Sequence, residues 1–136
     1  MQTVTVSRHL DADPDEVRAL MDDLEAFMLA AGFDGVTVDG DDLRIENGVG
    51  LATIELDLEL VERPGADLAY VQRDGIFREM ETRYVVEPSD GGAEVRATTE
   101  FALDVDLVGF LLDATVVKRQ RTHELESQFD YLESQT

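Results

Sequence analysis

The polar residues that could do chemistry stand at positions that the surrounding sequence pattern turns toward the interior. On expected strands these residues are Tyr70, Gln72, Arg78, Thr82, Tyr84 and Thr99. Arg121 interrupts the apolar stripe of an expected helix between Val117 and Leu125. A buried polar group needs a hydrogen-bond partner, and a buried arginine needs a carboxylate or a ligand oxygen. The pattern therefore predicts a cavity in which a few polar anchors stand among apolar walls.

A second interpretation of these residues stays open. If the strand ends bend and the register changes at Gly75, the polar groups reach solvent. From Leu68 to Arg73 the alternation also allows Ala69 and Val71 to point inward. The predicted ligand-binding set comprises Tyr70, Gln72, Arg78, Met80, Tyr84, Thr99, Phe101, Val117, Arg121 and Leu125.

Catalytic and metal-binding motifs are not predicted. His9 and His123 have no sequence neighbour at the spacing of a metal site or a catalytic triad. The segment 11–15 resembles the start of a calcium loop, but Glu16 stands where that loop requires glycine. The chain has no cysteine, which excludes disulfides and thiolate chemistry. We expect no catalytic constellation, no metal and no cofactor.

The charge balance is extreme, with 31 acidic against 11 basic residues and a formal net charge of −20. The acids are scattered, whereas an acidic interaction surface would gather them into one block. Lys118 is the only lysine, and the cluster 118–121 either pairs with acids or holds an anionic head group. Scattered acids predict adaptation to a high-salt cytoplasm, and they disfavour nucleic acid and anionic membranes. No apolar run reaches the roughly 18 residues of a membrane span, so membrane insertion is not expected.

Apolar periodicity predicts the elements that must position these residues. Residues 2–10 alternate as a strand. Asp13 and Pro14 begin a helix that the pair Asp22–Asp23 breaks in two. Further strands are predicted over 36–38, 43–45, 54–60, 68–74, 76–86 and 94–103, with turns at 39–42, 47–50, 64–65 and 88–92. A long helix is predicted from about Leu107 to Glu133.

This order predicts one α+β domain over residues 1–136. It has a helix-grip fold, in which a curved antiparallel sheet of six or seven strands wraps a long C-terminal helix, with two short helices after the first strand. The apolar stripe is densest over 107–117. A ligand site is therefore expected where residues 121–129 face the sheet.

Three segments resemble the START/SRPBCC superfamily, the Bet v 1-like or polyketide cyclase/dehydrase and lipid-transport group. They are residues 4–17, residues 92–101 and the terminal helix. The chain resembles an acidic member of haloarchaeal type. The resemblance implies a hydrophobic cavity between sheet and helix for lipids, polyketides or quinones, in relatives that are enzymes, carriers or accessory proteins.

The sequence thus favours a binder of an apolar small molecule. One alternative is a cyclase or dehydrase that uses Tyr70, Tyr84 or Arg121 to polarise a carbonyl. The other is a protein-interaction accessory domain, which an exposed apolar patch would indicate.

Overall fold

The computed structural model describes residues 1–49, 51–103 and 113–136. The strands are β1 (Gln2–Leu10), β2 (Gly35–Asp39), β3 (Asp42–Val49), β4 (Ala52–Leu60), β5 (Leu68–Asp74), β6 (Phe77–Ser89) and β7 (Gly92–Leu103). The helices are α1 (Pro14–Asp22), α2 (Leu24–Leu29) and α3 (Ala114–Gln135). None of these described helices is long and apolar enough to cross a membrane.

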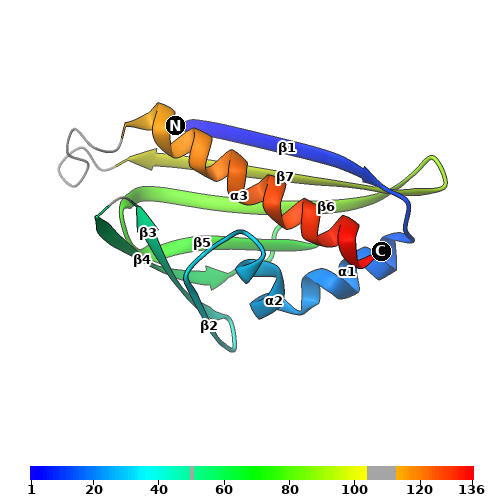
Figure 1. The fold of residues 1–136 in the computed structure, drawn as a ribbon, viewed down its shortest axis with the longest axis horizontal. Coiled ribbons are helices and arrows are strands. Elements are labelled where there is room, and N and C mark those ends of the chain that lie inside the picture. Colours follow the sequence, from blue (N-terminus) through cyan, green and yellow to red (C-terminus); the bar gives the residue numbers. More distant parts are fainter. Residues whose placement is uncertain (50, 104–112) are drawn as a thin grey trace.

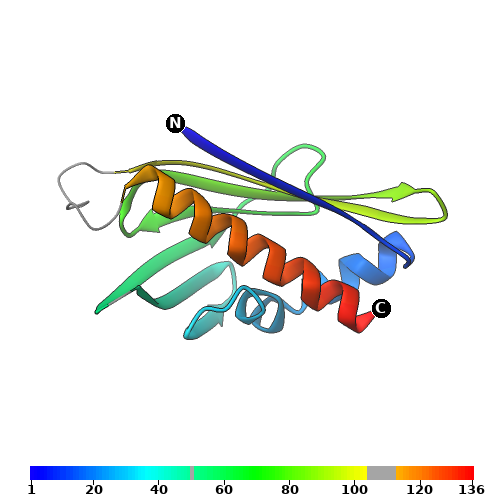
Figure 2. The same ribbon diagram turned by 45° about the horizontal axis from the view of Figure 1, so that its top comes forward.

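The seven strands form one antiparallel sheet in the order β1-β7-β6-β5-β4-β3-β2. Strands β2 to β7 follow one another as a meander, and β1 joins the sheet beside β7. The sheet curves around α3, while α1 and α2 lie near the C-terminal end of that helix (Figures 1 and 2). The predicted α+β helix-grip fold is confirmed.

The helical pair after β1 also forms as predicted. The side chain of Asp13 caps α1 by accepting a hydrogen bond from the Asp15 backbone N–H at 2.9 Å, and Pro14 takes the first helical position. Asp23 has φ −78° and ψ 77°, which is not helical, so the chain breaks there before α2 begins. Phe27 of α2 is buried and packs edge-on against Tyr84, with ring centroids 5.3 Å apart.

The turn predicted at 47–48 is wrong, whereas the turn predicted at 88–92 is confirmed but is shorter than predicted. Asn47 and Gly48 lie inside β3, where Asn47 pairs with Ile54. Pro88 lies inside β6 and pairs with Ala93, because Asp90 and the following glycine adopt positive φ and make the tight turn two residues later.

The bend between β5 and β6 depends on a glycine and a side-chain clamp. Gly75 has φ +156°, and a Cβ there would lie 2.5 Å from both Leu56 and Gln72. The Gln72 amide bonds both backbone groups of Phe77, donating to its carbonyl at 2.7 Å and accepting from its N–H at 3.1 Å. The clamp fixes where β6 begins.

Helix α3 begins later than predicted. Asp113 is extended at φ −97° and ψ 171°, and its carboxylate accepts a hydrogen bond from the Val116 N–H at 2.9 Å. A continuous helix through Asp113 is therefore ruled out, and the predicted segment 107–112 lies outside the described residues. The buried face of α3 consists of Val117, Arg121, Glu124, Leu125, Gln128, Phe129 and Leu132.

Candidate functional site

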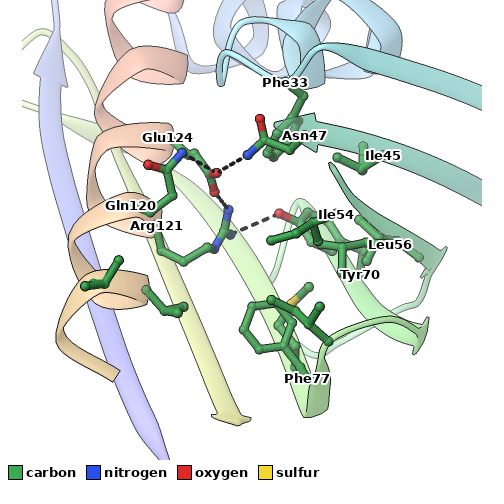
Figure 3. A pocket seen from close by; sticks show the side chains of 15 residues that line it. Phe33, Ile45, Asn47, Ile54, Leu56, Tyr70, Phe77, Gln120, Arg121 and Glu124 are labelled. Atoms are coloured by element: carbon green, nitrogen blue, oxygen red, sulfur yellow. Dashed lines mark hydrogen bonds and ion pairs between the residues drawn. The ribbon is translucent and has the colours of Figure 1, made fainter. Parts of the chain in front are cut away.

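A cavity of about 90 Å³ lies between strands β3 to β6 and the N-terminal part of α3 (Figure 3). Most of its walls are apolar. The lining residues are Phe33, Ile45, Asn47, Ile54, Leu56, Leu58, Tyr70, Ile76, Phe77, Met80, Val116, Val117, Gln120, Arg121 and Glu124. The volume is several times the roughly 10–15 Å³ that one water needs, and it lies below the roughly 300 Å³ at which ordinary ligand pockets begin.

A buried ion pair forms the polar end of the cavity. The Arg121 Nη1 group donates to Glu124 Oε1 at 2.5 Å, and the two side chains are only 8% and 5% exposed. Because the residues are three positions apart on α3, they lie on the same face of the helix. Figure 3 shows the pair reaching from α3 toward the strands.

Both oxygens of the Glu124 carboxylate accept hydrogen bonds from this chain. Besides Arg121, Gln120 Nε2 donates to Oε2 at 3.1 Å and Asn47 Nδ2 donates to the same oxygen at 3.5 Å. Both oxygens of the carboxylate therefore have partners. This coordination offsets much of the cost of burying a negative charge.

The Arg121 guanidinium is held from the other side by the sheet. Its Nη2 group donates to the hydroxyls of Tyr70 and Thr82, each at 3.2 Å, and Thr82 in turn donates to Thr99 at 2.8 Å. The Nε atom of Arg121 is buried and has no hydrogen-bond partner among the residues that the structure describes.

Arg121 keeps its positive charge despite burial. Burial alone would lower its pKa, but the neighbouring Tyr70 and Glu124 more than offset burial, so the net pKa shift is upward. The cavity thus holds a permanent cation next to a carboxylate.

A second polar group lies deeper in the core. The Tyr84 hydroxyl donates to Gln128 Oε1 at 2.6 Å, and Gln128 Nε2 donates to the backbone carbonyl of Phe27 at 3.1 Å. Burial raises the pKa of Tyr84 well above its ordinary value near 10, and the neighbouring Tyr70 raises it further. This network ties β6 to α3 and α2 and does not line the cavity.

The structure divides the predicted ligand-binding residues into three groups. Tyr70, Met80, Val117 and Arg121 line the cavity. A second group is buried outside the lining and consists of Tyr84, Thr99, Phe101 and Leu125. Their role in binding stays a prediction.

Gln72 and Arg78 form the third group, and neither lines this cavity. The Gln72 amide is used in the clamp on Phe77. The expectation that Arg78 points inward is wrong, because the register of β6 against β7 shifts between Phe77 and Glu79 and leaves Arg78 exposed.

Sequence reasoning missed three polar residues of the cavity, namely Asn47, Gln120 and Glu124. Glu124 stands three residues from Arg121, but carboxylates at such a spacing are common in a chain with 31 acids, and Asn47 was assigned to a turn. The cavity also lies earlier along α3 than expected, beside 116–124 instead of 121–129. The later part of the helix is filled, because Leu125, Gln128 and Phe129 pack into the core.

The cavity contains no recognisable catalytic constellation within residues 1–49, 51–103 and 113–136. Over the same residues, no three acidic or histidine side chains gather as a metal site would require. What the arrangement offers is apolar contact together with hydrogen-bond donors at one end.

A curved antiparallel sheet that grips a long C-terminal helix around an apolar cavity defines the START/SRPBCC class. The chain belongs to the polyketide cyclase / dehydrase and lipid transport family, whose model matches residues 1–133. No curated protein matches the chain.

Solved structures of similar fold come from several bacteria. Protein TTHA0849 from Thermus thermophilus is 21% identical, with a TM-score of 0.75 over 98% of this chain and 95% of its own. A START superfamily protein from Mycobacterium smegmatis is 14% identical, with a TM-score of 0.75 over 98% of this chain and 95% of its own. The Zhui aromatase/cyclase from Streptomyces sp. R1128 is 15% identical, with a TM-score of 0.74 over 97% of this chain and 93% of its own. At these identities the likeness concerns the fold.

Proposed function

We propose that the protein binds a small apolar molecule, or the apolar end of a larger one, in the cavity between the sheet and α3. The observation that carries this proposal is a cavity with aliphatic and aromatic walls and one polar end. A filled core would have left no such space, since protein interiors are close-packed. Membership in a family of cyclases, dehydrases and lipid-transport proteins supports the same function.

The size of the cavity limits the ligand. At about 90 Å³, it accommodates a short alkyl chain or one ring more readily than a whole lipid. We therefore propose that affinity rises with chain length only until the cavity is filled.

Native mass spectrometry of protein purified in concentrated KCl and transferred rapidly to a volatile salt tests this function. We expect an added mass on the wild-type protein that organic extraction removes. In Val117→Phe the larger ring occupies the cavity, so at least about 90% of the added mass should disappear, which corresponds to a loss of about 1.4 kcal/mol or more in binding. Val36 is half-buried and packs on the core outside the cavity, so Val36→Phe makes the same change of side chain elsewhere and should keep the ligand.

Two outcomes would count against the proposal. One is that neither wild-type protein nor a panel of added C6–C12 alkyl ketones and alcohols gives a saturable complex. The other is that Val117→Phe and Val36→Phe retain the ligand equally.

A second candidate function is catalysis in the same cavity. It is favoured by the bond from the Arg121 guanidinium to the Tyr70 hydroxyl, because a hydroxyl that accepts a charged donor is itself a stronger donor to a carbonyl. A ligand whose mass or ring count changes with time in the presence of wild-type protein, but not of Tyr70→Phe, would establish catalysis. An unchanged ligand leaves binding as the function.

The accessory-domain alternative gains no support from the described surface. The large exposed hydrophobic side chains there are Met1, Leu29, Leu51 and Val116, which lie on four different segments.

A further inference from the structure

The polar end of the cavity is asymmetric in its hydrogen bonding. Its one carboxylate, Glu124, has both oxygens occupied by donors of this chain. Arg121 Nε carries a buried N–H without a partner in the part of the chain that the structure describes. The Tyr70 hydroxyl accepts from Arg121 and also interacts with the Tyr84 hydroxyl. The cavity end therefore holds one buried donor without a partner, Arg121 Nε, and its acceptors apart from Glu124 and Tyr70 are the side-chain oxygens of Asn47 and Gln120.

Leaving such a donor unsatisfied in a buried site is unfavourable, and an acceptor on the ligand can remove that cost. Arg121 lines the cavity but its Nε atom is buried, so a ligand oxygen reaches Nε only when the Arg121 side chain turns toward the cavity. The ligand is thus expected to carry an acceptor at the end that faces α3.

The charge of that acceptor is decided by the ion pair. Arg121 and Glu124 are separated by 2.5 Å, so the pair has no net charge, and Glu124 offsets part of the attraction that Arg121 would exert on an anion. A carboxylate ligand would lose its hydration without meeting a net positive charge, and it would stand close to Glu124. The protein as a whole carries −20 and repels anions further.

Building on the proposed function, we infer that the cavity selects a neutral ligand bearing a hydrogen-bond acceptor, such as a ketone, ester or ether, and rejects the carboxylate of equal length. Glu124 is then the residue that determines specificity. It converts a cationic pocket, suited to fatty acids, into a neutral one.

The test compares three ligands with the same carbon skeleton length on the wild-type protein at pH 7 in concentrated KCl, where electrostatic attraction at long range is screened. They are 2-octanone, octanoate and octane, with dissociation constants measured by titration calorimetry or ligand-observed NMR. We expect 2-octanone to bind at least about tenfold more tightly than octanoate. We also expect it to bind at least about fivefold more tightly than octane, a difference in affinity that corresponds to roughly one hydrogen bond.

Substituting the carboxylate gives the sharper result. Glu124→Gln keeps the shape and removes the negative charge, so the uncompensated Arg121 should attract octanoate and reverse the order of the two ligands. Glu133→Gln is the matched control, since Glu133 is exposed near the end of the same helix and its loss changes the net charge by the same amount. The control should keep the wild-type order.

The outcomes separate this inference from the function on which it rests. If 2-octanone and octanoate bind the wild-type protein equally, or octanoate binds better, the inference is overturned while binding of apolar molecules stands. If no ligand binds, the proposed function fails. Should Glu124→Gln not fold, the wild-type ranking of the three ligands still decides the matter.

Discussion

At the scale of single residues, the buried polar side chains in the described part of this protein have hydrogen-bond partners, with one exception. The Tyr84 hydroxyl donates a hydrogen bond to Gln128, and the Glu124 carboxylate accepts from three donors. Arg121 is satisfied at both Nη atoms and unsatisfied at Nε. An exception of this kind in a well-bonded interior is informative, because buried donors in native proteins nearly always have a partner.

Titration of Tyr84 gives a prediction at this scale. The folded-state pKa is raised well above 10, so the folded protein binds the phenolic proton more tightly than the unfolded chain does. The associated stability is fully present below pH about 10 and is lost as the pH rises toward the folded-state pKa. We expect the free energy of unfolding to fall above pH 10 in wild type and to fall less steeply in Tyr84→Phe.

Denaturant unfolding at pH 8 to 11.5 measures this difference, and tyrosinate absorbance reports how many of the three tyrosines ionise before unfolding. Tyr131→Phe serves as the control, since Tyr131 is only partly buried on α3. If the free energy of unfolding depended on pH equally in wild type and Tyr84→Phe, the loss of stability could not be assigned to ionisation of Tyr84.

The residues of the Arg121–Glu124 ion pair and their neighbours show how much of the site the sequence predicts. The break in an apolar stripe identified Arg121, since a charge at a helical core position stands out. Glu124 could not be found in the same way, because a chain with 31 acids offers chance carboxylates at every spacing. Asn47 reaches the cavity only through the pairing of β3 with β4, which single-sequence patterns do not specify.

At the scale of elements, the start of α3 matters most, because four of the residues that line the cavity lie on its N-terminal part (Val116, Val117, Gln120 and Arg121). The sequence predicted the helix and its buried stripe but not its first residue. Helical periodicity does not reveal where a capping aspartate turns the chain out of the helix, and Asp113 is followed by residues that suit either state. The strands were easier, since alternation of acids and aliphatics is unambiguous over β4.

Removing the cap of α3 should weaken both the helix and the cavity. Asp113→Ala loses the bond to the Val116 N–H and is expected to cost about 1 kcal/mol in the free energy of unfolding, whereas Asp113→Asn keeps an acceptor and should cost only a few tenths. Denaturant unfolding measures the stabilities. If both variants were as stable as wild type, the cap would not be a stabilising contact.

At the scale of the whole molecule, charge dominates. Arginines meet acids in many surface pairs, such as Arg83 with Glu81 and Glu100 and Arg8 with Glu126 and Asp130. Single exposed pairs contribute little, about 0–1 kcal/mol each, and they leave a net charge of −20 unbalanced. Repulsion among the remaining carboxylates therefore opposes the folded state in dilute buffer.

Salt should relieve that repulsion. Raising KCl from about 0.1 M to 1 M shortens the screening length from about 10 Å to 3 Å. We expect the melting temperature to rise by about 10 °C or more, since each 1 kcal/mol corresponds to roughly 4 °C in a domain of this size. Calorimetry over a KCl series measures the rise, and a melting temperature that does not change with KCl would refute salt adaptation.

The pairing of β1 with β7 constrains how the chain can be made. Thr5 and Thr98 face each other across these strands although they stand 93 positions apart. On a ribosome that adds about 5–20 residues per second, β1 therefore waits roughly 5–20 seconds for its partner, with Val4, Val6 and Leu10 uncovered. An unpaired apolar strand invites association with other nascent chains. Mutual repulsion of the acidic chains opposes such encounters in dilute buffer, and the concentrated salt that favours the folded state also screens this repulsion.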